Sequence, residues 1–250
     1  MTDATLTVDR FAEGDFRVGH ALGQAWSVLS RNFPSFFAVT AVAAMPQAAT
    51  DALGDPIDFL LVQGFGPVLR VEGLGPLLGH VLATLSQAVV LYGAFQDMRG
   101  KRVSLGESMR VGLRRFFPVV GVAISTTLLG YLGLFVFVVP GLICFTTWFV
   151  ATPACVVEGR GVFSSLARSA RLTRGHGWKI FGLMLLLFVF NSIVDSPIDQ
   201  ALSGVPAFAG HVIWNGVWSA FCAILAVVTY HDLRVAKEGV DIEQIAAVFE

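Results

Sequence analysis

The chain has 250 residues, of which 55% are hydrophobic and only 14% are charged, and its formal net charge is −1. A soluble domain carries about 25% charged residues, so this composition excludes an ordinary soluble globular fold. The segment 117–139 has 23 residues without a charge. As a helix it would be roughly 35 Å long, enough to cross a hydrocarbon core of about 30 Å. The composition therefore indicates an integral membrane protein.

Uncharged windows predict six membrane spans, in a single membrane domain that covers residues 1–250. Backbone polar groups in lipid must be satisfied within the segment, so the spans are expected to be helices. The predicted spans are 33–50, 76–96, 117–139, 140–157, 180–194 and 205–230. Between the first two, the glycine-rich segment 54–75 is compatible with either a re-entrant or an interfacial segment.

An amphipathic helix is expected before spans one, three and five. Near the N-terminus, Asp15 can cap a helix whose apolar side begins with Val18 and Leu22. Before span three, Ser104 and Glu107 have the capping-box spacing that satisfies free N–H groups at a helix start. The apolar and cationic residues that follow lie on different sides, as in a helix lying in the membrane interface. In this helix they are Leu105, Met109 and Leu113 against Arg110 and Arg114.

The third such helix lies within 161–181, with Phe163 and Leu166 on its apolar side and Arg168 and Arg171 on its polar side. Other features recur at matching places. Pro-containing outer turns are expected at 55–58 and 196–199, and spans two, four and six end in an acidic residue, any residue and Arg. We therefore predict three repeats, at about 15–99, 104–160 and 161–234, followed by a cytoplasmic tail at 235–250. Each repeat is an interfacial helix and a two-span hairpin, and three hairpins predict a pseudo-threefold axis along the membrane normal.

The distribution of cations predicts the orientation of the spans. Sixteen Lys and Arg residues lie in the N-terminal segment, the tail and the loops after spans two and four, whereas the other loops contain only Arg70. Because Lys and Arg accumulate in cytoplasmic loops, both termini are expected in the cytoplasm.

The run SLARSARLTRGHGWKIFGLMLLL at 165–187 and the ending Tyr230-His231-Asp232-Leu233-Arg234 resemble the glycerophosphoryl diester phosphodiesterase membrane-domain family. Its relatives include uncharacterised bacterial inner-membrane proteins, some of them fused to a soluble phosphodiesterase domain. The resemblance implies a membrane module. The catalytic domain is absent here because the chain is used up by spans and short loops, so we expect no enzyme activity.

Two groups of polar residues are candidates for binding. Arginines on the interfacial helices can hold anionic lipid headgroups, since an Arg fork matches phosphate oxygens. The headgroup candidates are Arg110, Arg114, Arg168, Arg171 and Arg174. Uncharged or weakly basic residues within spans are costly in lipid and are expected to face the bundle interior. These are Gln87, Asn191, His211 and Asn215.

A third group lies on the outer side, where carboxylates and imidazoles could hold a cation or move a proton. Its members are Asp55, Asp58, His80, Asp195, Asp199 and His211, and the simpler interpretation is that they cap turns and bond the backbone. We therefore expect neither a metal nor another cofactor.

The sequence thus predicts a non-enzymatic membrane module that binds anionic lipids or a membrane partner. The module is expected to organise or move what it binds. A groove-reading motif is absent, so nucleic acid is not expected as a partner. Two alternatives stay open: a small-molecule or ion transporter with a wet path past Asn215, Gln87 and Asn191, and an assembly subunit of a larger membrane complex.

Overall fold

The computed structural model describes residues 16–53, 74–202 and 204–238, and within these ranges every regular element is a helix. Two helices come from the N-terminal part, α1 (Val18–Arg31) and α2 (Phe33–Leu53). The middle of the chain forms α4 (Leu74–Met98), α5 (Leu105–Arg114), α6 (Phe116–Val136), α7 (Val138–Thr147) and α8 (Ala151–Glu158). The C-terminal part forms α9 (Val162–Thr173), α10 (Gly177–Ala201) and α11 (Gly204–Glu238).

The all-helical prediction is confirmed for the described residues, and the chain is a multi-pass membrane protein. Four segments are long and apolar enough to cross a membrane: α6, the consecutive pair α7 and α8, α10 and α11. A fifth is obtained if α1 and α2, which meet at a bend of 91°, count as one span. Asp15 and residues 54–73 of the predicted segment 54–75 fall outside the described residues, and residues 74 and 75 belong to α4. Helix α1 begins after Arg17.

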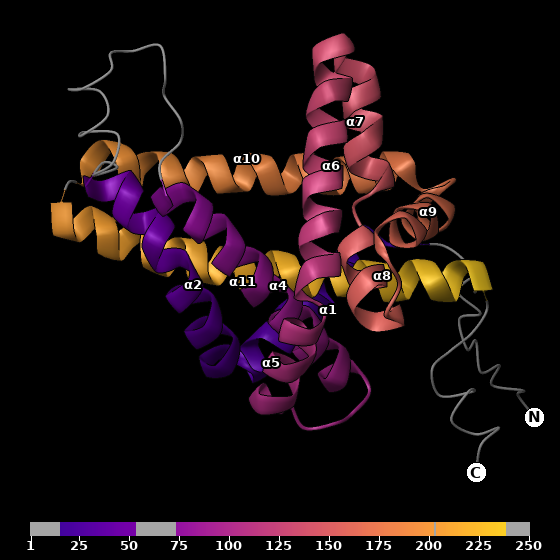
Figure 1. Cartoon of the computed structure of the whole chain (residues 1–250), viewed down its shortest axis with the longest axis horizontal. Helices are drawn as coiled ribbons and strands as arrows, with labels where there is room; N and C mark the ends of the chain where they lie inside the picture. Colours follow the sequence, from indigo (N-terminus) through magenta and orange to yellow (C-terminus); the bar gives the residue numbers. More distant parts are fainter. Residues whose placement is uncertain (1–15, 54–73, 203, 239–250) are drawn as a thin grey trace, which may run out of the picture.

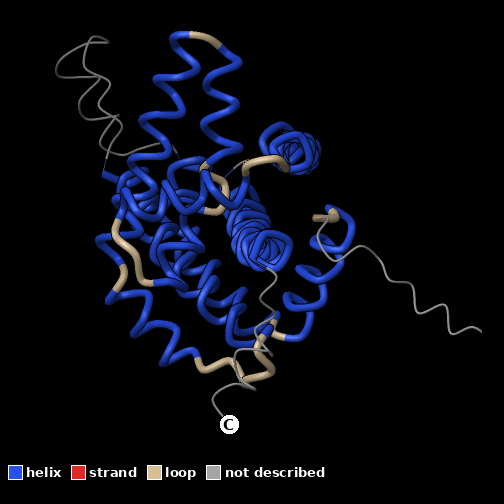
Figure 2. The backbone as a smooth tube through the Cα atoms, turned by 90° about the vertical axis from the view of Figure 1, so that its right-hand side faces the viewer, coloured by secondary structure: helices blue, strands red, loops and turns tan. Residues whose placement is uncertain are grey.

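Two hairpins extend in different directions. In Figure 1, α10 and α11 run side by side along the length of the molecule, and α6 and α7 form an upright pair that crosses them. Figure 2, turned by 90°, looks along α10 and α11, and the α6–α7 pair again stands upright. The α6–α7 hairpin is close-packed because glycines face each other. A Cβ built on Gly133 would lie 2.9 Å from the Cα of Gly141.

Two of the predicted spans differ from the structure near a proline. The fourth span is divided at 148–150 into α7 and α8. Pro153 lies in the first turn of α8, where its missing N–H group needs no partner. The expected turn at 196–199 is also wrong, because Pro197 lies inside α10, which continues to Ala201.

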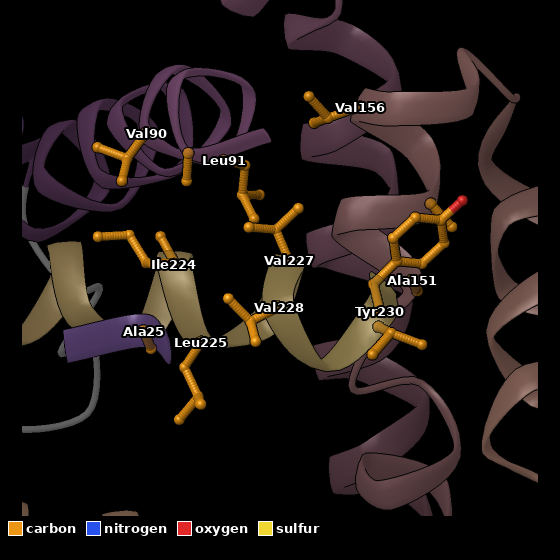
Figure 3. Close-up of a cluster of buried hydrophobic side chains, with 14 of the residues drawn as sticks. Ala25, Val90, Leu91, Ala151, Val156, Ile224, Leu225, Val227, Val228 and Tyr230 are labelled. Carbon is orange, nitrogen blue, oxygen red and sulfur yellow. The ribbon is translucent and has the colours of Figure 1, made fainter. Parts of the chain in front are cut away.

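The core lies where α4, α8 and α11 meet, near the ends of these helices that carry Asp97, Glu158 and Asp232. Helices α4, α8 and α11 contact one another there. Figure 3 shows Val90 and Leu91 of α4 beside Ile224 and Val227 of α11, with Ala151 of α8 nearby. All five of these side chains are fully or almost fully buried.

The three short amphipathic helices dock on this core through small residues at equivalent positions. Each helix buries the residues four and eight positions after its N-cap, whatever else its sequence contains. The pairs are Ala21 and Ala25 in α1, Ser108 and Gly112 in α5, and Ser165 and Ser169 in α9. Helix α1 contacts α11, α5 contacts α4, and α9 contacts α8. Small residues allow this close approach: a Cβ on Gly112 would lie 2.7 Å from Val89 Cγ2.

Candidate functional site

Helix α5 carries an apolar stripe that is exposed in the described part of the structure. The predicted cap is present, since the Ser104 hydroxyl accepts a hydrogen bond from the Glu107 N–H at 3.4 Å. The buried side of the helix consists of Ser108 and Gly112. Its larger apolar side chains, at 105, 109 and 113, are exposed. They therefore face away from the core and toward the surroundings of the protein.

Cations and aromatic side chains lie beside this stripe. Arg110 and Arg114 are both exposed on α5. Phe117, directly after the helix, has 81% of its surface exposed. An exposed apolar stripe next to arginines is the arrangement of a helix that lies at a membrane–water interface.

Helix α9 exposes two of its three predicted arginines. Arg171 lies on the exposed side of the helix and Arg174 follows its last residue, also exposed. Phe163 at the start of α9 and Trp178 at the start of α10 have 83% and 86% of their surface exposed. Trp is enriched at membrane interfaces, so the exposed Trp178 favours an interfacial position for the start of α10.

Arg168 does not lie with Arg171 on the exposed side, contrary to the periodicity of the sequence. It is 9% exposed and is surrounded by carboxylates. Its Nε donates to Glu158 Oε1 at 2.8 Å, and its Nη2 donates to Glu238 Oε2 at 2.9 Å. Its Nη1 donates to the other oxygen of Glu238. The guanidinium is thus used within the protein, not offered to a headgroup.

The carboxylates around Arg168 join three helices at their charged ends. The Tyr230 hydroxyl of α11 donates to Glu158 Oε1 of α8 at 2.5 Å, and Arg160 donates to the other Glu158 oxygen. Hydrogen bonds, chiefly to Glu238, raise the pKa of Arg168 above its ordinary value. The group stays cationic, and the network connects α8, α9 and α11.

The other two acid-x-Arg ends also bond neighbouring helices. Asp97 at the end of α4 accepts hydrogen bonds from Arg31 at 2.6 Å and from Asn32 at 2.9 Å. Asp232 of α11 lies 3.3 Å from Nδ1 of His20 on α1. The return helices α4, α8 and α11, which form the second half of each predicted hairpin, are therefore connected at their charged ends to the amphipathic helices.

A cavity of about 460 Å³ lies among α2, α4, α10 and α11, away from these charged ends. It brings together three predicted residues, His80, Asp195 and Asn215. His211 is buried beside it, with its Nδ1 3.8 Å from Asp195 Oδ1. Sequence reasoning missed the polar lining residues Thr40, Gln47, Ser86 and Ser219. An isolated Ser, Thr or Gln in an apolar run gives no signal of a shared cavity.

The remaining predicted residues are spread over other places. Asn191 accepts a hydrogen bond from Trp214 Nε1 at 3.1 Å, and neither Asn191 nor Gln87 lines the cavity. The path predicted for a transporter is therefore represented in the cavity only by Asn215. Asp55, Asp58 and the side chain of Asp199 lie outside the described part of the structure. Among the described residues, no group of three or more His, Cys, Asp or Glu side chains could hold a metal ion.

Comparison with known proteins gives one match. The model of a domain of unknown function, DUF7847, matches residues 111–233, a little under half of the chain. The matched region extends from α5 into α11 and contains Arg114, Arg168 with its partner Glu158, and Asp195, whereas Glu238 lies beyond it. No curated protein and no solved structure matches the chain.

Proposed function

We propose that this chain is a non-enzymatic membrane module that binds anionic lipids at its cytoplasmic face and organises them there. The observation that supports it most is the surface of α5, where an exposed apolar stripe lies beside Arg110 and Arg114. Each Lys or Arg near an anionic leaflet gains about 1 kcal/mol, and a second amphipathic helix, α9, adds Arg171 and Arg174. Arg168 is left out of this site because its donors are used by carboxylates.

The proposal includes six spans arranged as three pseudo-threefold hairpins, each preceded by an interfacial helix. It requires the α6–α7 pair, which crosses α10 and α11 in Figure 1, to align with them in one bilayer. Three contacts of the same kind support it, since α1, α5 and α9 each dock on a return helix through small residues at the same two positions. A second set of contacts follows the same cycle. Each outgoing helix contacts the return segment of the repeat before it: α2 with α11, α6 with α4, and α10 with α7.

The location belongs to the same proposal. The bias of Lys and Arg favours both termini in the cytoplasm, and the resemblance to a family with bacterial inner-membrane relatives favours that membrane. The resemblance to the glycerophosphoryl diester phosphodiesterase membrane-domain family is compatible with a membrane module. The module would act on membrane lipids or beside a membrane partner.

Replacing Arg110 and Arg114 by Gln is expected to weaken retention of anionic lipid. The loss of about 1 kcal/mol per cation corresponds to roughly tenfold to thirtyfold in affinity. The measurement is titration of delipidated protein in mild detergent with phosphatidylglycerol and, separately, phosphatidylcholine, with bound lipid counted by native mass spectrometry.

The matched control is the double substitution Lys101→Gln with Arg102→Gln. These side chains are exposed in the neighbouring loop, and their replacement removes the same charge without touching the apolar stripe. The proposal requires that only the α5 variant loses its preference for phosphatidylglycerol. Equal loss in both variants would reduce the effect to net charge, and unchanged binding in both would refute a site on α5.

A further inference from the structure

The cavity among α2, α4, α10 and α11 is separate from the proposed lipid site and has its own chemistry. Its lining comes from one stretch of α2, one stretch of α4, one residue of α10 and one side of α11. The polar residues of the lining are Thr40, Gln47, His80, Ser86, Asp195, Asn215 and Ser219. Its volume of about 460 Å³ is within the range of small-molecule sites.

The charge of the lining selects for a cation. Asp195 is the carboxylate of the described lining, which contains neither Lys nor Arg. Its side chain is 34% exposed, so a ligand in the cavity can reach it. This carboxylate, which has His211 Nδ1 3.8 Å from its Oδ1, attracts a positive group and repels an anion in the cavity.

The hydroxyl groups of the lining add hydrogen-bond acceptors. The Thr40 hydroxyl donates to the Phe36 carbonyl at 2.9 Å, and the Ser86 hydroxyl donates to the Ala83 carbonyl at 2.9 Å. Because each hydroxyl donates its single proton to a backbone carbonyl, its oxygen retains lone pairs that can accept a hydrogen bond. The amide of Asn215 supplies a further carbonyl oxygen. An ammonium group, with three N–H donors, matches such a site.

We propose that this cavity binds a protonated primary amine, with the Asp195 carboxylate as its charge partner. The amine has two sources with the same chemistry, a free small molecule such as ethanolamine or the headgroup of phosphatidylethanolamine. The site contains none of the arginines of α5 and α9. Its test is therefore separate from the test of the lipid site proposed there.

The experiment uses the full chain in phosphatidylcholine nanodiscs and follows tryptophan fluorescence, because Trp218 lines the cavity. One arm adds ethanolamine to the solution, and the other incorporates increasing phosphatidylethanolamine into the discs. A saturable change in the first arm assigns the site to a free amine, and a change only in the second assigns it to the lipid headgroup. Absence of a saturable change in both arms overturns the proposal.

Three variants connect the response to the cavity. Asp195→Asn is expected to weaken binding by about tenfold or more, because it removes the charge that strengthens the hydrogen bond. Asp232→Asn makes the same change at the opposite end of the bundle, beside His20, and should leave binding unchanged. Equal binding by Asp195→Asn and the unmodified protein would overturn the proposal.

Ala44→Phe keeps the test decisive if Asp195→Asn does not fold. Ala44 lines the cavity, so a phenyl ring there occupies its volume while every charge is retained. Binding should be lost in this variant with thermal stability kept. A folded Ala44→Phe protein that binds the amine with unchanged affinity would place the site elsewhere and contradict the proposal.

Discussion

Replacing Arg168 by Gln is expected to lower the free energy of unfolding by about 3–5 kcal/mol, the usual cost of removing one partner from a buried ion pair. Arg168 is 9% exposed, and its guanidinium bonds both Glu158 and Glu238. Without it, two carboxylates are left close together at the ends of α8 and α11. The measurement is thermal or denaturant unfolding of the full chain in mild detergent.

The control for this variant is Arg160→Gln. Arg160 bonds the same carboxylate of Glu158, but its side chain is 40% exposed. Exposed ion pairs contribute about 0–1 kcal/mol, so this variant should stay close to the unmodified protein. Adding Glu158→Gln to Arg168→Gln should cost less than the sum of the two single changes, because both belong to one network. Equal stability of the two Arg variants would show that Arg168 does not hold α8, α9 and α11 together.

Replacing Gly141 by Leu is expected to open the α6–α7 hairpin. A Cβ at Gly141 would lie 2.5 Å from the backbone nitrogen of Leu134, so the two helices cannot relieve the clash by moving a side chain. Overpacking of a close contact costs typically 1–3 kcal/mol, and a backbone clash is expected at or above the upper end of that range. The measurement is again the unfolding transition in detergent.

Gly182→Leu is the matched control in another long apolar helix. A Cβ at Gly182 meets no atom within 4 Å, and Leu favours a helix more than Gly does. Its transition should be unchanged or slightly raised. An equally stable Gly141→Leu protein would contradict the packing of α6 against α7.

The sequence predicts the helices well because a membrane imposes simple patterns. Uncharged windows located α2, α4, α6, α10 and α11, and the Ser104 cap located the start of α5. Prolines were harder to interpret. Pro197 appeared to mark a turn but lies within α10, since freed backbone groups in membrane helices can be satisfied by their neighbours. Pro153 lies just after the division between α7 and α8, but the uncharged run around it predicted one continuous span.

The sites were predicted in part, because their partners are distant in the chain. Helical periodicity placed Arg168 on the polar side of α9, facing solvent, and its partner Glu238 is 70 residues away in the sequence. Only the fold shows that this arginine is enclosed. The cavity likewise joins residues of α2 to residues of α11, and hydropathy alone could identify its charged members but not Thr40 or Ser219. The buried small pairs of α1, α5 and α9 could have been found by aligning the three helices at their N-caps.

The central claim is that three related hairpins enter the membrane from one side, with their amphipathic helices on the cytoplasmic face. Single-cysteine labelling tests it most directly, in a protein whose own cysteines, Cys144, Cys155 and Cys222, have been replaced. Labels are placed by Arg110→Cys on α5, Arg171→Cys on α9 and Gln200→Cys near the end of α10. In intact cells, an impermeant maleimide should react with the cysteine at position 200 alone, and the other two should react only after lysis. Reaction of positions 110 and 171 from opposite sides of the membrane would contradict the account.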